Sequence, residues 1–336
     1  MRETLPRTLG SHVVTDLTTV PAPATTFADH FDRIVDNIEK VIRGKRLVIE
    51  RSVVCLMAEG HLLVEDVPGV GKTSLAKALA TSIDCKFGRV QFTPDVLPSD
   101  VTGVSIWQRE QRQFEFQPGP IFANIVLGDE INRASPKTQA ALLEAMEERQ
   151  VTIDGISHTL EQPFMVLATQ NPMEHEGTYP LPDSQLDRFL MRVSVGYPDR
   201  GAAIEILDGH GQTRVEIASV IDAATVSSMI DAARGVHVAP SIKGYIVALA
   251  EASRQHSAVA LGVSPRATVA LQSASRALAA SRGRDHVVPD DIKELAEVVL
   301  SHRLALTSDA QLQGRSVSAV INDIAEAVPV PTGHDA

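Results

Sequence analysis

The sequence predicts an α/β fold in which a doubly wound, mainly parallel sheet is followed by a smaller all-helical domain. Three observations support this prediction. Apolar runs of the kind found in buried parallel strands recur between residues 62 and 193, with helical segments between them. A glycine-rich turn joins the first of these runs to a helix. Beyond residue 197 the apolar spacing is helical throughout.

Length, charge and hydropathy narrow the class of protein. The 336 residues predict about two domains, and a hydrophobic content of 44% is sufficient for a sizeable core. The formal net charge of -11 makes nucleic acid an unfavourable partner, because polyanion binding needs clustered Lys and Arg. The sequence contains no apolar run of about 18 uncharged residues, so we expect no membrane insertion and a cytoplasmic location.

We expect four segments along the chain. Residues 1–28 are rich in Thr and Pro and predict a flexible leader. Residues 29–197 form the α/β domain, and residues 198–326 form the helical domain. The Gly-Tyr-Pro-Asp sequence at 196–199 marks the boundary between these domains. Residues 327–336 predict a flexible tail.

The helical pattern of residues 27–58 is interrupted at 41–45. Gly44 breaks the apolar periodicity just upstream of the first core strand. Two interpretations stay open at this point: the turn lines an adenine pocket, or it is an ordinary connection between two helices.

The glycine-rich turn predicts a phosphate-binding loop. Its glycines let successive backbone N–H groups converge on an anion, and the following helix presents the positive end of its dipole. The end of the turn matches the pattern G-x-x-x-x-G-K-[ST], but Asp66 occupies the first glycine position. We expect nucleotide binding by Pro68, Gly69, Val70, Gly71, Lys72, Thr73 and Ser74.

Two hairpins are expected to project from the α/β domain. The turn-rich segment 93–103 interrupts the strand-helix alternation, and the apolar residues after it flank polar ones like two hairpin arms. Trp107 is expected to pack within this hairpin rather than to stack on a ligand. Residues 151–160 alternate around Asp-Gly, which is a strong signal for a second hairpin.

Two adjacent carboxylates follow the apolar run 122–127 and predict the chemistry. Asp129 ends a predicted parallel strand, where it could hold Mg²⁺ together with the hydroxyl of Thr73. Glu130 points differently and could polarise water as a general base. We therefore predict hydrolysis of a bound nucleoside triphosphate, with Thr73 and Asp129 as the metal ligands.

For three other polar residues, sequence physics leaves alternatives open. Asn171 could orient water or contact the terminal phosphate, but Asn also favours a turn before proline. Arg188 is either an ion-paired surface residue or a charge presented to the nucleotide of another subunit. Arg266 lies in the first turn of a predicted helix, where a cation opposes the helix dipole, and it could face back toward the phosphates.

Several motifs, taken in order, resemble those of the MoxR-type AAA+ ATPase family. They are EDVPGVGKT at 65–73, DEINRA at 129–134, ATQNP at 168–172, EGTYPLP at 176–182, LDRF at 186–189 and VSPR at 263–266. The resemblance runs from residue 30 to residue 325, which is nearly the whole chain. It implies an AAA+ P-loop domain with a helical lid, and ATP and Mg²⁺ as cofactors.

The resemblance also implies a role for each candidate residue. These roles are Walker A for Lys72 and Thr73, Walker B for Asp129 and Glu130, sensor 1 for Asn171, a trans arginine finger for Arg188 and sensor 2 for Arg266. Segment 93–103 with its hairpin would be the helix-2 insert and 151–160 the pre-sensor hairpin, both near a central pore.

Family resemblance further implies a ring, usually a hexamer, that remodels a protein client or inserts a metal into it. A von Willebrand factor A-domain protein is the implied partner. A second hypothesis stays open, in which the chain is a nucleotide-dependent binding switch or scaffold and ATP-driven assembly is the function. A GTPase or small-molecule kinase is disfavoured, because the sequence lacks an Asn-Lys-x-Asp stretch and because a kinase would not explain the helical domain.

Overall fold

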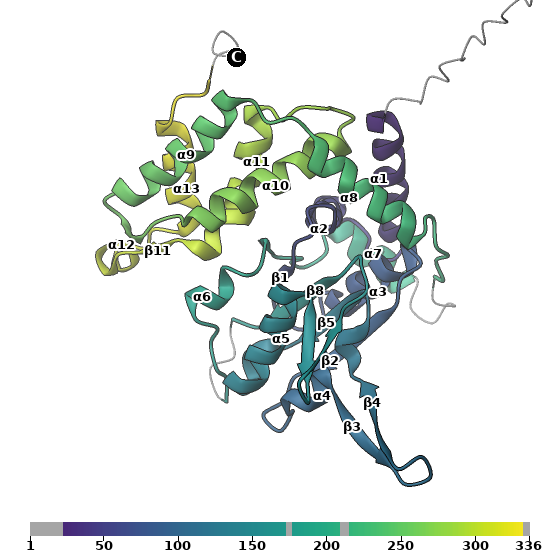
Figure 1. Cartoon of the computed structure of the whole chain (residues 1–336). Coiled ribbons are helices and arrows are strands. Elements are labelled where there is room, and N and C mark those ends of the chain that lie inside the picture. The colour runs from purple at the N-terminus through teal and green to yellow at the C-terminus, as the bar shows by residue number, and fades with distance from the viewer. Residues whose placement is uncertain (1–22, 173–176, 209–214, 332–336) are drawn as a thin grey trace, which may run out of the picture.

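A computed structural model describes residues 23–172, 177–208 and 215–331. A five-stranded parallel sheet lies at its centre (Figure 1). Its strands, in spatial order, are β2 (Phe87–Gln91), β5 (Ile125–Asp129), β8 (Met165–Gln170), β1 (Leu62–Glu65) and β9 (Met191–Val193). Every neighbouring pair is parallel, so the predicted α/β fold is confirmed.

The strand register brings the loops that matter to one edge of the sheet. Glu65 at the end of β1 lies opposite Gln170 of β8, and Gln91 at the end of β2 lies opposite Asp129 of β5. The segments that follow β1, β5 and β8 therefore leave the sheet at the same edge. In open parallel sheets, ligands bind at this carboxyl edge.

The chain enters the sheet through α1 (Pro23–Glu39) and α2 (Arg46–Met57), which are separated by the predicted break. Helix α1 starts at Pro23, inside the segment 1–28 for which a flexible leader is expected. Phe27 is buried and stacks on Phe31, with 6.5 Å between ring centroids, so these apolar contacts anchor the first turns. Residues 1–22 lie outside the described part of the chain.

Both predicted hairpins are present. The first hairpin lies downstream of α3 (Lys72–Ser82) and β2. It is preceded by the short helix α4 (Pro98–Thr102), which packs on α5 (Pro136–Glu148). The hairpin itself consists of β3 (Gly103–Gln108) and β4 (Gln113–Pro118) and projects away from the sheet (Figure 1). Trp107 packs edge-on against Phe114 within it, as predicted. The second hairpin, β6 (Gln150–Ile153) and β7 (Ile156–Thr159), turns at Asp154 and Gly155, which both have positive φ. Short 3₁₀ turns lie at Pro120–Phe122 and Ile131–Arg133.

The helical domain follows α6 (Asp183–Leu186) and β9. Its helices are α7 (Arg200–Asp208), α8 (Ala223–Gly235), α9 (Pro240–Gln255), α10 (Pro265–Ser281), α11 (Pro289–Leu300), α12 (Ser308–Leu312) and α13 (Val317–Ala327), with a 3₁₀ turn at Ser301–Arg303. It also contains a small antiparallel pair, β10 (Val259–Leu261) and β11 (Ala305–Leu306), which the sequence did not predict, since such short strands show little alternation. Some residues of the sequence predictions lie outside the described chain. These are Glu176 of the EGTYPLP motif, residues 209–211 of the expected helical domain and residues 332–336 of the expected tail. No helix within the described ranges is long and apolar enough to cross a membrane.

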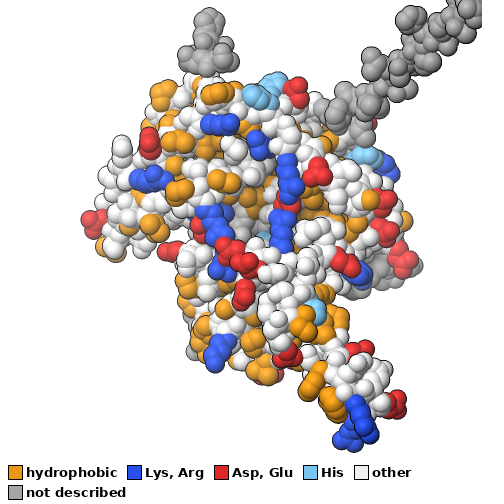
Figure 2. Space-filling model, viewed as in Figure 1, with side chains coloured by type: hydrophobic (Ala, Val, Ile, Leu, Met, Phe, Trp, Pro, Cys, Tyr) orange, Lys and Arg blue, Asp and Glu red, His pale blue; other side chains and the backbone are white. Residues whose placement is uncertain are grey.

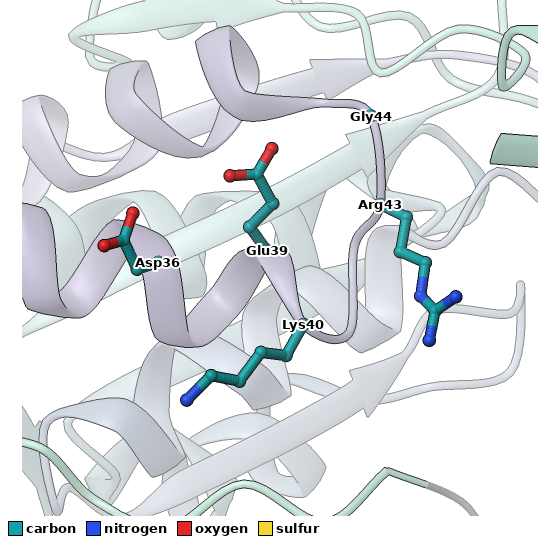
Figure 3. Close-up of a pocket in the computed structure, with 5 residues that line it drawn as sticks. All are labelled: Asp36, Glu39, Lys40, Arg43 and Gly44. Atoms are coloured by element: carbon teal, nitrogen blue, oxygen red, sulfur yellow. The ribbon is translucent and has the colours of Figure 1, made fainter. Parts of the chain in front are cut away.

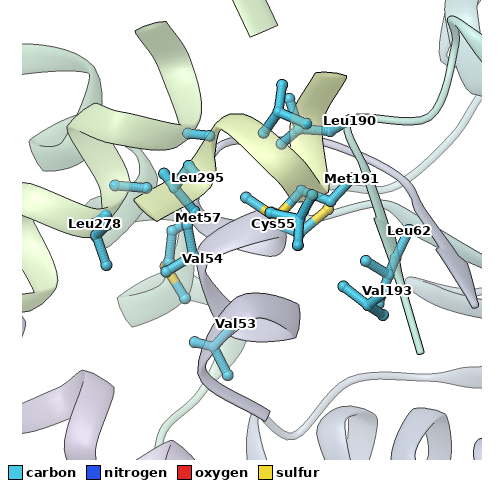
Figure 4. Close-up of a cluster of buried hydrophobic side chains, with 14 of the residues drawn as sticks. Val53, Val54, Cys55, Met57, Leu62, Leu190, Met191, Val193, Leu278 and Leu295 are labelled. Atoms are coloured by element: carbon cyan, nitrogen blue, oxygen red, sulfur yellow. The ribbon is translucent and has the colours of Figure 1, made fainter. Parts of the chain in front are cut away.

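One hydrophobic core joins the two domains. Helix α2 is buried along most of its length and packs against β9 and α10. Figure 4 shows Val54 and Met57 of α2 close to Leu278 of α10 and Leu295 of α11, with side chains of β1 and β9 on the other side. The chain therefore crosses from sheet to helices near residue 197, but the first two helices pack against both parts.

Candidate functional site

The phosphate loop connects β1 to α3. Gly69 and Gly71 have φ values of 86° and 94°, a conformation that side chains with a Cβ rarely adopt. Gly71 occupies the N-cap position of α3, so no side chain caps that helix. The first N–H groups of α3 are therefore free of intrahelical acceptors and can bind an anion. Lys72 Nζ lies across the loop and donates to the backbone oxygen of Asp66 at 2.8 Å.

The side chain of Asp66 points out of the loop and explains the departure from the glycine pattern. Asp66 does not have a positive φ, so its backbone does not require glycine. Its carboxylate accepts hydrogen bonds from the N–H of Gly196 at 2.6 Å, the hydroxyl of Ser194 at 3.0 Å and the N–H of Val67 at 2.8 Å. Burial raises the pKa of Asp66, but these hydrogen bonds outweigh it and hold the pKa below its usual value. Asp66 thus ties the phosphate loop to the segment that leads into the helical domain.

A buried threonine on β8 organises the two predicted catalytic carboxylates. The Thr169 hydroxyl donates to Asp129 Oδ1 at 2.7 Å and accepts from the backbone N–H of Glu130 at 2.9 Å. Glu130 has a left-handed backbone with φ of 60° and directly precedes the 3₁₀ turn Ile131–Arg133. Thr169 was not predicted as a site residue, and its only signal is its position one residue before the end of β8.

Strand β2 supplies polar partners to the same carboxylates. Arg89 Nη2 lies 2.9 Å from Asp129 Oδ2, and Gln91 Nε2 donates to Glu130 Oε2 at 3.1 Å. Arg133 Nη1 lies 3.2 Å from the same Glu130 oxygen. Arg89 and Gln91 were not predicted as site residues. Their spacing of two positions, which places both side chains on one face of a strand, is the signal that could have found them.

The oxygen donors at this edge fit Mg²⁺. Thr73 is the second residue of α3, which packs against β5, and Asp129 is the last residue of β5. Mg²⁺ prefers a few protein oxygens together with phosphate and water oxygens. Among the described residues no group of three or more His, Cys, Asp or Glu side chains could hold a metal. A metal ion at this edge would therefore depend on oxygens from phosphate and water.

Asn171 lies at the same edge, directly after β8. Its side chain is buried, and its backbone oxygen is 3.5 Å from Asn132 Nδ2. The structure therefore places Asn171 at the edge that also carries Asp129, Glu130 and the phosphate loop.

The turn that contains Gly44 lies beside the phosphate loop. A Cβ built on Gly71 would lie 3.7 Å from Cδ1 of Ile42, and one on Gly44 would lie 3.2 Å from Cβ of Ala202. Next to the turn is an open hollow of about 460 Å³, drawn in Figure 3 and lined by Asp36, Glu39, Lys40, Arg43 and Gly44. A base-binding role for Gly44 stays a prediction.

Arg188 and Arg266 lie together, away from the phosphate loop of their own chain. Arg188 Nη2 is 3.1 Å from one carboxylate oxygen of Glu147, and Arg266 Nη2 is 2.7 Å from the other. They line a cavity of about 240 Å³ at the contact between the two domains, together with residues 59–61. Figure 2 shows acidic and basic side chains side by side in the hollow between the two parts of the molecule.

The position of this cavity places it at the opposite edge of the sheet. Residues 59–61 precede β1, whereas the phosphate loop follows it. Since a strand rises about 3.3 Å per residue, the five steps from residue 61 to residue 66 separate the two locations by roughly 16 Å. Arg266 thus does not face the phosphates of its own chain, contrary to the orientation considered from its sequence position. The reason is that α10 begins beside the turn that carries Arg188, where Ser264 Oγ donates to Asp187 Oδ2 at 3.4 Å.

Two buried side chains of the helical domain hold the turn that carries Arg188. Arg303 donates through Nε to Asp187 Oδ1 at 2.6 Å and through Nη2 to the backbone oxygen of Phe189 at 2.6 Å. His302 Nε2 lies 2.9 Å from the same Phe189 oxygen. Burial, together with the charge of Arg303, lowers the pKa of His302 to about 3, so the ring is neutral. Neither Arg303 nor His302 was predicted as a site residue, because no motif marks them.

Comparison with known families and proteins agrees with this geometry. The model of the ATPase family associated with various cellular activities (AAA) matches residues 61–191, and that of the AAA lid domain matches residues 251–324. The chain is 49% identical over 306 residues to the uncharacterized protein YeaC of Bacillus subtilis, covering 90% of this chain and 96% of that protein.

Two further similarities extend over most of the chain. It is 40% identical over 309 residues to the chaperone MoxR1 of Mycobacterium tuberculosis, covering 89% of this chain and 82% of that protein. The crystal structure of a candidate ATPase from Cytophaga hutchinsonii superposes with a TM-score of 0.87 at 36% identity, covering 92% of this chain and 97% of the other.

Proposed function

Because this chain belongs to the MoxR-type AAA ATPases, we propose that it hydrolyses ATP at the carboxyl edge of its sheet and uses the cycle to remodel client proteins. One observation carries the proposal. The phosphate loop, the adjacent Asp129 and Glu130, and Asn171 all lie at that edge. The parts needed for phosphoryl transfer to water are thereby gathered on one side of the sheet.

Each residue has a distinct task in this proposal. The N–H groups at the start of α3 and the ammonium of Lys72 bind the phosphates, and the ammonium has two further donors beside the one bonded to the backbone oxygen of Asp66. Thr73 and Asp129 would hold Mg²⁺, which neutralises charge on the phosphate oxygens when bound. Glu130 accepts a proton from the attacking water, and Asn171 orients that water.

Two polar neighbours orient Glu130 in the structure. Gln91 and Arg133 both donate to Oε2 of its carboxylate, so Oε1 can accept from a water molecule while these hydrogen bonds are kept. We assign to Gln91 and Arg133 the role of setting the direction of the Glu130 side chain.

We propose that Arg188 and Arg266 both act on the nucleotide of a neighbouring subunit. In support, both lie at the edge of the sheet opposite to the phosphate loop of their own chain. An arginine supplied in this way typically raises the rate of hydrolysis by a factor of ~10³–10⁵. The active form would then be a ring, which we expect to be hexameric.

The chaperone-like output is proposed from the name of the mycobacterial relative. We also propose a von Willebrand factor A-domain partner, with metal insertion as one form that remodelling could take. The projecting β3-β4 hairpin carries exposed Trp107 and Phe114 and is our candidate for client contact.

The hydrolysis assignment is tested with Glu130→Gln. We expect phosphate release to fall by about 10²–10⁴, because the general base is lost, while ATP binding is retained. Glu144→Gln, an exposed glutamate on α5, is the matched control and should hydrolyse normally. Normal turnover in Glu130→Gln would refute the assignment. If partner capture persists in Glu130→Gln loaded with ATP, assembly rather than turnover would be the function.

The trans assignment is tested by mixing two inactive variants, Lys72→Ala and Arg188→Ala. Neither variant should hydrolyse ATP alone. In mixed rings about a quarter of the interfaces would pair an intact phosphate loop with an intact arginine, so activity should reappear. Mixtures that stay inactive although they form rings would refute the trans role.

A further inference from the structure

One carboxylate joins the two arginines of the cavity. Glu147 lies near the end of α5, Arg188 follows α6, and Arg266 lies in the first turn of α10. Its Oε1 accepts from Arg266 Nη2 at 2.7 Å, and its Oε2 pairs with Arg188 Nη2 at 3.1 Å. Two guanidinium groups from distant parts of the sequence thus contact the same carboxylate, one on each oxygen.

A carboxylate in this position resembles a phosphoryl group in its chemistry. Both groups present anionic oxygens attached to one central atom, and guanidinium donors bind both in a planar, directed way. Glu147 therefore offers Arg188 and Arg266 the kind of ligand that a terminal phosphate would offer.

The remaining charges of the cavity are already paired. Arg149 Nη1 lies 2.6 Å from Glu59 Oε1, and Arg303 Nε lies 2.6 Å from Asp187 Oδ1. The lining of the cavity contains four arginines and three carboxylates, so its charge is positive overall. Because the other arginines have carboxylates of their own, the Glu147 carboxylate is the one that an incoming anion would displace.

The Glu147 pairs can also exchange. The side chains of Glu147 and Arg266 are 37% and 48% exposed, and ion pairs of this exposure are weak in water. The hydrogen bond from Arg266 nevertheless holds the pKa of Glu147 below its usual value, so the carboxylate is charged at neutral pH.

We propose that Glu147 is a stand-in for the terminal phosphate of a nucleotide bound to a second copy of this chain. In the free subunit it holds Arg188 and Arg266 in a preorganised pair, and it releases them when the phosphate of the neighbour arrives. Glu147 is then a positioning residue that also keeps other anions out of the cavity. The inference rests on the proposed trans role of the two arginines.

The first test needs no hydrolysis. Lys72→Ala serves as the parent, because it weakens the phosphate loop, and binding of inorganic tripolyphosphate is measured by calorimetry on unassembled subunits. Adding Glu147→Gln should tighten binding at least about tenfold, because a competing anion is removed. Adding Glu144→Gln should change nothing, and adding Arg266→Ala to the Glu147→Gln protein should abolish the gain. Unchanged affinity in Glu147→Gln, or a gain that survives the loss of Arg266, would overturn the proposal.

A second variant separates positioning from folding. Glu147→Asp keeps the charge but shortens the side chain by one methylene, so it can reach only one arginine well. In assembled rings we expect Glu147→Gln and Glu147→Asp to lower kcat by about three- to tenfold with the KM for ATP unchanged, since the phosphate loop is intact. A merely structural residue would lower the thermal midpoint instead, and an unchanged kcat would overturn the positioning role. If the natural chain hydrolyses no ATP at all, the proposed function fails, whereas the tripolyphosphate titration still decides the role of Glu147.

Discussion

Replacement of Asp66, which stands at the first glycine position of the phosphate-loop pattern, tests whether its carboxylate stabilises the loop. Asp66→Ala removes a buried carboxylate that accepts three hydrogen bonds, from Val67, Ser194 and Gly196. In this variant the three groups that donate to the Asp66 carboxylate lose their acceptor, so the phosphate loop should be held less firmly to the segment after β9.

The magnitude follows from the hydrogen bonds that are lost. A hydrogen bond to a charged group contributes about 1.5–3 kcal/mol net, but the Ser194 hydroxyl can rotate to water and the contributions are not additive. We therefore expect the free energy of unfolding to fall by about 3 kcal/mol and the thermal midpoint by roughly 4 °C. ATP affinity should fall as well, since Lys72 bonds to the backbone of Asp66.

The assay compares three variants by thermal unfolding at pH 7. Asp66→Asn keeps the shape and one good acceptor oxygen, so it should lose about half as much stability as Asp66→Ala. Asp66→Gly restores the glycine of the phosphate-loop pattern and should be at least as unstable as Asp66→Ala, because glycine adds flexibility to the unfolded chain.

The pH dependence gives an independent check. The folded pKa of Asp66 lies below its unfolded value, so its contribution is complete above the unfolded pKa and is lost as the pH falls through the folded pKa. The stability difference between the natural chain and Asp66→Asn should therefore shrink below about pH 4. An Asp66→Gly protein that matches the natural chain in stability and ATP affinity would refute the reasoning.

Three other predictions concern buried polar groups. Burial lowers the pKa of His61 to about 4 and that of His302 to about 3. The free energy of unfolding should therefore fall as the pH drops from about 6.5 toward 4, by about 3 kcal/mol for His61 alone. Urea unfolding at pH 7.0, 5.5 and 4.5 measures this fall, and a free energy of unfolding that does not change with pH would contradict it. Asp291→Ala leaves Arg284 without its fully buried partner at 2.6 Å and should cost about 3–5 kcal/mol in the same assay, whereas a cost under about 1 kcal/mol would show that the pair is dispensable. Thr169→Val keeps the shape but removes the hydroxyl between the adjacent carboxylates, so kcat should fall about tenfold at similar KM; unchanged kcat argues against that hydroxyl as their organiser.

The sequence was sufficient for the fold class and for one edge of the site. Buried parallel strands are apolar on both faces, so the runs at 62–64, 125–127 and 165–168 could be recognised without partners. The topological rule that places functional loops at the carboxyl ends of such strands then grouped the phosphate loop with Asp129. The two glycines of the loop could be recognised from the sequence, because tolerance of a positive φ is a local property of glycine.

Contacts between distant segments could not be derived in this way. The sequence contains no sign that Glu147 meets Arg188 and Arg266, because their contact depends on how α10 docks beside the end of α5. Two partners of Asp66, Ser194 and Gly196, lie more than a hundred residues downstream, and their contacts depend likewise on the pairing of β1 with β9.

Sequence alone therefore determined what is local: strand and helix periodicity, the glycine turn and the carboxylates at a strand end. Only the tertiary structure decided to which side of the molecule Arg188 and Arg266 belong. The physical reason is that hydrophobic burial sets the docking of α1 and α2 against α10, and that docking is a sum over many non-directional contacts rather than a property of any short motif.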